Sequence, residues 1–380
     1  MQMTAQASTL SPRIAAAVRP FESRDLTQVV ELYTNVFPRG RQYSVHRLHA
    51  RFEKILLQNP WYDPSIPSLV YEQAGKIVGF LGVVVRPMML RDVPLRMAVS
   101  NHFMVDPGSR TTKAGLSLLS KFFSGPQDLA LAEAGDASRK IWEVLGGHTS
   151  FRYSLYWTRL LRPARYGLYQ LERTKLPRYV RGLCKPFCNL ADGILSRMTQ
   201  SQVHRQSRSA EEEISVAEFL ECISRAGGRS ALRPIYDEDS LDWLLTVLAE
   251  KQALGTLHKS VVRGKQRQII GWYTYYLNPE GVSTVLQMWS STGRLDEVLN
   301  HISYHAWSSG SIALTGRMQP AFTKEYSTNQ CFLHWRSWML LHSRDPKILE
   351  SVENQDAFFT TLEGESWISI EGELADTDSH

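Results

Sequence analysis

One stretch of the chain has the residue types and spacing of an anion-binding turn. An apolar run ends at Phe103, Met104 and Val105, and a Pro-Gly turn then leads through Arg110, Thr111, Thr112, Lys113, Ala114 and Gly115 into a helical pattern. Main-chain N–H groups at a helix N-terminus attract anions. Gly115 allows a bulky ligand to approach the backbone, and Lys113 adds a cation. The stretch predicts a phosphate site; the alternative is a plain strand–turn–helix link with basic surface residues.

The elements around this turn can be read from apolar periodicity and turn residues. We expect a strand at 17–19, helices from Asp25 and over 44–57, a hairpin of 68–72 with 77–85, a strand at 95–105, a helix from 114, a strand at 128–133 and a helix from 135 to 146. Alternating aromatic residues at 151–157 predict a strand that closes this unit. The predicted order is β-α-α-β-β-β-α-β-α-β.

The same order of elements is predicted a second time after residue 212. Its strands are expected at 213–215, 258–263, 269–277, 282–289, 311–315 and 332–341, with helices at 217–225, from Asp239, at 295–307 and at 319–326. The turn after its third long strand, residues 289–297, does not repeat the spacing from arginine to glycine of the first copy. Asp296 and Glu297 in the next helical turn would repel a phosphate. We therefore expect only the first copy to bind one.

The first turn resembles that of the GCN5-related N-acetyltransferase (GNAT) superfamily. That pattern is an apolar strand, V-x-P, and then Q/R-x-x-G-x-G/A at the start of a helix. Here Val105 and Pro107 match the turn, Arg110 stands at the Q/R position and Gly115 at the final glycine, while Lys113 replaces the central glycine. The resemblance implies that Phe103, Met104 and Val105 pair with the pantetheine arm of coenzyme A, and that residues 110–115 hold its phosphates.

A second superfamily motif, N-x-x-A-x-x-x-Y-x-x-x-G, aligns with residues 135–146. Ser138 stands at the alanine position and Gly146 at the glycine, but Gly135 replaces the asparagine and Trp142 the tyrosine. That tyrosine often protonates the coenzyme A thiolate, which an indole N–H cannot do at neutral pH. The motif supports the fold and adds Ser138 to the cofactor-binding residues, but it leaves the acid unassigned.

The resemblance implies transfer of an acyl group from a thioester to an amine, which needs a base for the amine and an acid for the thiolate. Glu133, at the end of the strand before the second motif, is our candidate base, and Tyr153 our candidate acid. His102, in the central strand, is a third candidate whose alternative is a core histidine. The co-substrate is expected to be acetyl-CoA or another acyl-CoA, and the acceptor an amine of a small molecule or a sugar or peptide precursor.

These features give an α+β fold class: two tandem GNAT-like domains, each a mixed, mostly antiparallel sheet flanked by helices. We divide the 380 residues into an N-terminus 1–15, an acyl-CoA-binding domain 16–162, a connector 163–211, a degenerate second domain 212–370 and an acidic tail 371–380. The net charge of +5 is unevenly spread, since residues 159–208 hold 11 Lys and Arg against two acidic residues. The connector is either a helical linker packing on both domains or a patch with weak affinity for anionic surfaces.

The composition also argues against disulfide-stabilised, metal-binding and membrane-spanning proteins. The four cysteines form no C-x-x-C pair, and Cys184 and Cys188 have no histidine near them, so we expect neither a disulfide framework nor a metal. We see neither a secretory leader nor an apolar run long enough for a membrane span, and expect a cytoplasmic protein without a specific nucleic-acid partner.

Three functions remain open from the sequence. The first is an acyl-CoA-dependent N-acyltransferase. The second is a degenerate tandem GNAT that binds or scaffolds without turnover, which Lys113 and Trp142 would explain. The third is a FemABX-like aminoacyl transferase, suggested by the repeated fold and the basic connector, although the phosphate-binding turn counts against it.

Overall fold

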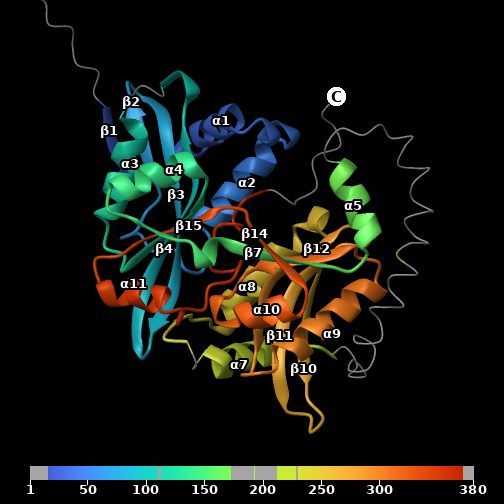
Figure 1. Ribbon diagram of the computed structural model, residues 1–380. Helices are drawn as coiled ribbons and strands as arrows, with labels where there is room; N and C mark the ends of the chain where they lie inside the picture. Colours follow the sequence, from blue (N-terminus) through green and yellow to red (C-terminus); the bar gives the residue numbers. More distant parts are fainter. Residues whose placement is uncertain (1–15, 110–112, 173–191, 193–211, 228–229, 371–380) are drawn as a thin grey trace, which may run out of the picture.

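The computed structural model describes residues 16–109, 113–172, 192, 212–227 and 230–370. It confirms the predicted α+β class, with two mixed, largely antiparallel sheets that carry helices on their faces (Figure 1). None of the helices in the described ranges is long and apolar enough to cross a bilayer.

The first sheet has eight strands in the order β1-β2-β3-β4-β5-β15-β6, with β9 added to the far end of β3. Its strands are β1 (Ala16–Pro20), β2 (Leu69–Gln73), β3 (Lys76–Leu90), β4 (Val93–Val105), β5 (Leu129–Ala134), β6 (His148–Ser150), β9 (Leu232–Pro234) and β15 (Trp338–His342). The pair β4–β5 is parallel, and its neighbours are antiparallel.

The second sheet has seven strands in the order β14-β7-β13-β12-β11-β10-β8. They are β7 (Leu155–Leu160), β8 (Glu212–Glu213), β10 (Thr256–Arg263), β11 (Ile269–Leu277), β12 (Val282–Ser290), β13 (Ala313–Arg317) and β14 (Cys331–Trp335). Here β12 and β13 are the parallel pair, so the second sheet repeats the arrangement around β4 and β5.

Helices cover both faces of each sheet. The α-helices are α1 (Leu26–Val36), α2 (Val45–Leu56), α3 (Ala114–Phe123), α4 (Asp136–Val144), α5 (Pro163–Glu172), α7 (Val216–Gly227), α8 (Glu238–Ala249), α9 (Leu295–Ser308), α10 (Thr323–Thr328) and α11 (Pro346–Glu353). On the first sheet, α1 and α2 pack on the face of Val99 and Leu131, and α3 and α4 on the face of Ala98 and Ala130 (Figure 1). The alternation of buried side chains along β4 and β5 produces these two faces.

The sequence predicted an N-cap residue for α1 and another for α8. Asp25 immediately precedes α1, as its spacing predicted, but its side chain makes no capping hydrogen bond to this helix and accepts the N–H of Glu22 instead. The prediction of Asp239 as the cap of α8 was wrong, because Asp237 accepts the N–H of Ser240 at 2.8 Å and Asp239 lies in the first turn. The carboxylate of Asp237, two residues earlier, thus accepts an N–H group that has no partner within the helix.

The prediction that residues 151–157 form a strand closing the first sheet was wrong. Residues Arg152–Ser154 form a short 3-10 turn, and β7 begins after it and pairs with β13 and β14 of the second sheet. The predicted single strand 332–341 is in fact two strands. Its first part, β14, stays in the second sheet, while β15 crosses to pair with β5 and β6 of the first. Each half of the chain thus completes the sheet of the other.

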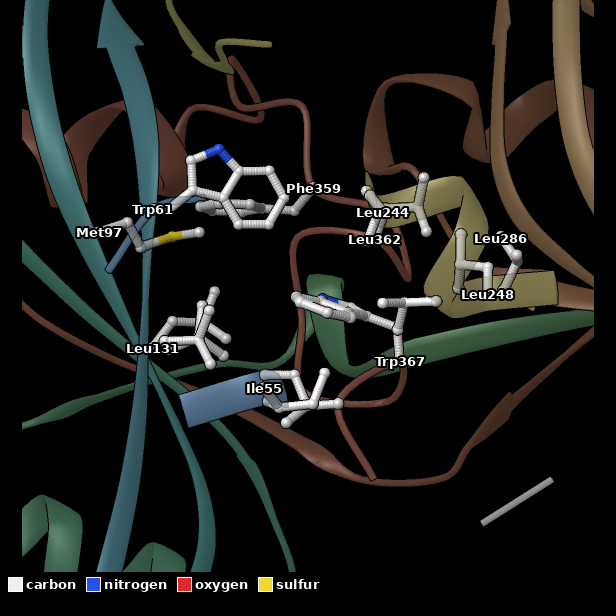
Figure 2. Close-up of a cluster of buried hydrophobic side chains, with 14 of the residues drawn as sticks. Ile55, Trp61, Met97, Leu131, Leu244, Leu248, Leu286, Phe359, Leu362 and Trp367 are labelled. Atoms are coloured by element: carbon white, nitrogen blue, oxygen red, sulfur yellow. The ribbon is translucent and has the colours of Figure 1, made fainter. Parts of the chain in front are cut away.

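A buried C-terminal segment, residues 357–370, lies between the two sheets. Its residues Phe359, Leu362 and Trp367 are 1% exposed or less. One continuous core joins Met97 and Leu131 of the first sheet through this segment to Leu248 and Leu286 of the second (Figure 2). The two units therefore share a core rather than meeting at a surface.

Candidate functional site

The central parallel strands separate at their C-terminal ends. The register of β4 with β5 covers three residue pairs and ends at Val99 and Leu131, although β4 continues to Val105 and β5 to Ala134. On β4 a β-bulge follows, because His102 and Phe103 both lie opposite Leu81 of β3. The bulge bends the strand away from its neighbour, and His102 adopts a positive φ of 46° there. The result is an opening in the sheet, hereafter the splay.

A cavity of about 460 Å³ occupies the splay. Strands β4 and β5 contribute Ser100–Phe103 and Ala132–Ala134. The α3/α4 face contributes Leu119, Gly135, Ser138 and Trp142, and the opposite face contributes Tyr33, Phe37, Pro38, Arg39, Glu365 and Ser369. The cavity thus passes from one face of the sheet to the other, a shape that suits a thin ligand threaded between two strands.

The predicted phosphate-binding turn lies beside this cavity. Arg110, Thr111 and Thr112 lie outside the described residues. Lys113 is exposed and immediately precedes α3, Ala114 is fully buried, and a Cβ on Gly115 would lie 3.2 Å from the ring of Phe103. The start of α3 is therefore packed directly against the end of β4, and only glycine fits without displacing that ring.

The predicted pantetheine-pairing residues divide between the cavity and the core. Phe103 lines the cavity, whereas the side chain of Met104 is buried in the core on the α1/α2 face. Val105, partly buried, ends the strand. This alternation leaves the main chain of β4, rather than its side chains, available along the splay.

His102 lines the cavity as a neutral imidazole. Burial first, and then the charges of Arg51 and Lys251, lower its pKa to about 3. Its Nδ1 donates to Oδ1 of Asn101 at 2.8 Å. A histidine that is protonated only near pH 3 is too weak a base to deprotonate an ammonium group at neutral pH.

Glu133 is at the predicted strand end, and its carboxylate is already engaged. It forms an ion pair with Arg317 of β13 at 2.7 Å, and the two side chains are 7% and 1% exposed. It also accepts the N–H of Glu365 at 2.9 Å and the hydroxyl of Ser366 at 3.1 Å. Glu133 therefore links the two sheets and the C-terminal segment.

The side chain of Glu365 lines the cavity and was not found from the sequence. The main-chain N–H groups of His102 on β4 and Glu133 on β5 lie near its carboxyl and lower the pKa of this group in part. Burial, and next the charge of Glu133, raise the pKa of Glu365 to about 8. A carboxyl with this pKa can exchange protons near neutral pH.

A signal for this residue was nevertheless present. Apolar residues recur at 357–359, at 362 and at 367–370, after the last predicted strand. Such a run is typical of a buried segment, and a carboxyl inside it is a candidate for a raised pKa. What it does not reveal is which cavity the carboxyl would enter.

Tyr153, the predicted acid, lies outside the cavity wall. It is 0% exposed, and its hydroxyl donates to the carbonyl of Ala357 at 2.7 Å. Burial raises its pKa. The residue ties the first unit to the C-terminal segment.

Trp142 and Ser138 of α4 both reach the cavity wall. The indole N–H of Trp142 donates to the carbonyl of Leu341 on β15 at 2.9 Å, which fixes the ring between α4 and the sheet. Ser138 lies in the first turn of α4, close to the helix N-terminus. Trp142 thus forms an apolar wall where the resemblance would place a tyrosine.

The equivalent opening in the second sheet is filled by the protein itself. The register of β12 with β13 ends at Val285 and Gly316. Beyond it, Thr361 of the C-terminal segment donates its N–H to Leu286 at 3.0 Å, and Gln319 donates to Met288 at 2.5 Å. Only about 10 Å³ of cavity is left there. The main-chain edge that faces a cavity in the first sheet is hydrogen-bonded to other parts of the protein in the second.

No protein-family model and no curated protein matches this sequence. Solved structures do match it. A probable N-acyltransferase from Enterococcus faecalis is similar over 87% of this chain and 73% of its own, with 10% identity and a TM-score of 0.57. A GCN5-related N-acetyltransferase from Kribbella flavida is similar over 86% and 71%, with 12% identity and a TM-score of 0.53.

A third similar structure is the N-myristoyltransferase of Saccharomyces cerevisiae with bound myristoyl-CoA. It covers 89% of this chain and 81% of its own, with 13% identity and a TM-score of 0.50. At such identities the likeness concerns the fold. The chain has the GNAT fold, in two tandem GNAT-like units, as the sequence resemblance implied.

Proposed function

We propose that this chain is an acyl-CoA-dependent N-acyltransferase that binds its co-substrate in the splay of the first sheet. The observation that carries the proposal is the position of Glu365: a carboxyl with a pKa of about 8 lines the cavity between β4 and β5. The fold supports the class, because the similar structures include N-acyltransferases and one with bound myristoyl-CoA.

The wall of the cavity suits the parts of an acyl-CoA. The pantetheine arm carries amide groups, which can pair with main-chain groups of β4 and β5 beyond Val99 and Leu131. The phosphates belong at the start of α3, where helix N–H groups and Lys113 attract anions. Leu119, Trp142 and Leu340 offer apolar surface to an acyl chain.

The chemistry requires one proton to move from nitrogen to sulfur. The amine nitrogen attacks the thioester carbonyl, a C–N bond forms, the C–S bond breaks and the coenzyme A thiolate leaves. Ionised Glu365 takes a proton from the amine and then gives it to the thiolate. A thiol has a pKa of about 8.5, so the carboxyl at about 8 is closely matched to the leaving group.

The second unit serves the site without binding coenzyme A. Arg317 at the end of β13 holds the carboxylate of Glu133, which in turn holds the main chain of Glu365. Its own splay is filled by the C-terminal segment. Glu133 and Arg317 are positioning residues in this scheme, and Tyr153 has no part in the reaction.

A second candidate is a protein that binds acyl-CoA without turnover. The observation that favours it is the indole N–H of Trp142, which is committed to Leu341 and cannot protonate a thiolate. Transfer to any amine rules this candidate out.

Titration calorimetry with coenzyme A, acetyl-CoA, octanoyl-CoA and myristoyl-CoA tests the proposal, together with thiol release in the presence of an amine panel. We expect micromolar binding and amine-dependent thiol release. Failure of all four compounds to bind would refute the proposed function.

A further inference from the structure

His102 lines the cavity, but the proposed reaction gives it no role. Its ring lies in the same cavity wall as Glu365, and its main-chain N–H lies near the carboxyl of Glu365. The ring also packs against the buried rings of Tyr33 and Phe52, with centroids 5.6 and 4.9 Å away, on the α1/α2 face. The imidazole is therefore beside the proton-transfer group, on the face of the sheet opposite α3, where the phosphates are expected.

The neighbouring residue Asn101 determines which ring nitrogen of His102 carries the proton. Asn101 is 1% exposed, and its amide Nδ2 donates to the carbonyl of Val99 at 3.4 Å. A carbonyl can only accept, so this contact turns the amide oxygen toward the ring, where Oδ1 lies 2.8 Å from Nδ1 of His102. Since Oδ1 can only accept as well, the proton of the neutral ring is on Nδ1. Nε2 therefore presents a lone pair.

The Nε2 atom of His102 is left for a ligand. Among the described residues, none forms a hydrogen bond with this nitrogen, and it is not one of the buried atoms there that lack a partner. It is therefore reached from the cavity that the ring lines. The pKa of the imidazole, lowered to about 3, keeps the ring neutral at physiological pH. In this state Nε2 accepts a hydrogen bond, and it can neither protonate the thiolate nor donate to an oxyanion.

We infer that Nε2 of His102 accepts a hydrogen bond from the nitrogen of the acceptor amine and so holds this nitrogen for attack on the thioester. The inference rests on the proposed function. A neutral primary amine has two N–H groups. When its lone pair forms the C–N bond, the nitrogen becomes positively charged and Glu365 takes one of the two protons. The second N–H remains on the nitrogen, also in the amide product, and donates to His102.

The same contact makes His102 a specificity-determining residue. A neutral secondary amine has one N–H group, and it loses this proton to Glu365. Its reaction therefore leaves the Nε2 lone pair without a donor in a site that is largely closed to water. An unpaired acceptor of this kind should lower kcat/KM about tenfold.

Acyl transfer from the acyl-CoA that binds best is measured with pairs of amines that differ by one N-methyl group. The pairs are benzylamine and N-methylbenzylamine, tyramine and N-methyltyramine, and glycinamide and sarcosinamide. We expect kcat/KM of the wild type to be about tenfold higher for the primary amine of each pair that reacts. The bulk of the methyl group also disfavours the secondary amine, so variants of His102 are needed to separate the two causes.

Two variants remove the lone pair in different ways. His102→Asn tolerates the positive φ of 46° but is too short to reach the position of Nε2, and His102→Phe keeps a ring of similar size. Both should lower kcat/KM for the primary amine about tenfold and leave that of its N-methyl partner unchanged, with acyl-CoA affinity in calorimetry as in the wild type. His342→Asn removes a half-buried imidazole outside the cavity wall and is the matched control, which should change neither value.

Two results would overturn the inference and leave the proposed function standing. One is an equal loss for both members of a pair. The other is faster transfer to the N-methyl amine in His102→Asn without a loss for the primary amine, which would show that the ring only limits the size of the cavity. Binding of acyl-CoA by the wild type without transfer to any amine overturns both the inference and the proposed function.

Discussion

The carboxylate of Glu133 accepts the main-chain N–H of Glu365. The N–H of Glu365 lies 2.9 Å from Oε1 of Glu133, and the charge of Glu133 helps to raise the pKa of the Glu365 carboxyl. Two carboxyl groups therefore lie in one partly desolvated place, where a cation is needed for both to be charged at once. Arg317 compensates Glu133, so the proton is held by Glu365.

Replacing Glu365 by Gln should abolish proton transfer while keeping the shape of the side chain. We expect kcat to fall about 10²-fold or more, the usual contribution of a general base, with acyl-CoA affinity little changed. Thiol release and calorimetry measure the two effects separately. Glu350→Gln, on the exposed face of α11, is the control and should behave as the wild type. A Gln variant with full activity would show that Glu365 carries no proton.

The pH dependence of kcat should report the same group. Activity should rise with pH as Glu365 ionises, with an apparent pKa of about 8, and level off above it. Stability should change in the opposite direction. Between pH 4.5 and 8 the native carboxyl holds a proton that the unfolded chain has lost, so the free energy of unfolding falls as pH rises. Denaturant titrations of the wild type and of Glu365→Gln at several pH values should differ in this slope, and parallel curves would contradict the raised pKa.

Breaking the ion pair between Arg317 and Glu133 should be costly on either side. Arg317→Met leaves the buried carboxylate of Glu133 without this counter-charge, and Glu133→Leu does the same for the buried guanidinium of Arg317. Each should lower the free energy of unfolding by about 3–5 kcal/mol. The double variant should lose less than the sum of the two single changes.

Arg317→Met has a kinetic consequence that a purely structural role would not produce. Without the cation, the charge of Glu133 acts fully on Glu365, so the apparent pKa of kcat should move above 8. An unchanged pH profile would show that Arg317 supports the fold alone.

Gly364 is required by the close approach of the C-terminal segment to Glu133. A Cβ at this position would lie 1.6 Å from Oε1 of Glu133. Gly364→Ala should therefore displace that carboxylate, lower kcat and destabilise the fold, while acyl-CoA binding is retained. Gly167→Ala in α5 meets no atom within 4 Å and should be neutral or stabilising by about 0.5–1 kcal/mol. Comparable thermal melts for the two variants would refute the requirement.

His102 should make the protein sensitive to acid. The native imidazole has a pKa of about 3, against 6.5 as the ordinary value. Below pH 6.5 the imidazole of the unfolded chain binds a proton that the native imidazole does not bind. The free energy of unfolding therefore falls with falling pH. His102→Asn keeps a residue that tolerates the positive φ of 46° and should flatten this acid limb in urea titrations. If the free energy of unfolding of this variant falls as steeply at acidic pH as that of the wild type, other groups cause the loss of stability.

Local patterns predicted the elements that form the cavity. The hairpin of β2 and β3, the strand β4 with its turn, and the helices α3 and α4 follow from apolar periodicity and turn residues, which act within a few residues. For the same reason the sequence alone could place Phe103 at the end of a strand and Gly115 and Ser138 in the first turns of two helices.

The rest depends on contacts between distant parts of the chain. Leu155 and Trp157 alternate as a strand should, but alternation does not say which sheet receives them, and they pair with residues more than 150 positions away. Tyr153 fits the same alternation and yet lies in a turn. Glu365 meets Glu133 across 232 positions, a contact that no local propensity encodes.

The exchange of β7 and β15 also bears on how such a chain can evolve. Two adjacent copies with separate sheets could be copied, lost or joined to other proteins one at a time. Here either half, moved alone, would leave behind an incomplete sheet and would itself lack a strand. Recombination that keeps both sheets complete can therefore transmit the two halves only as a unit.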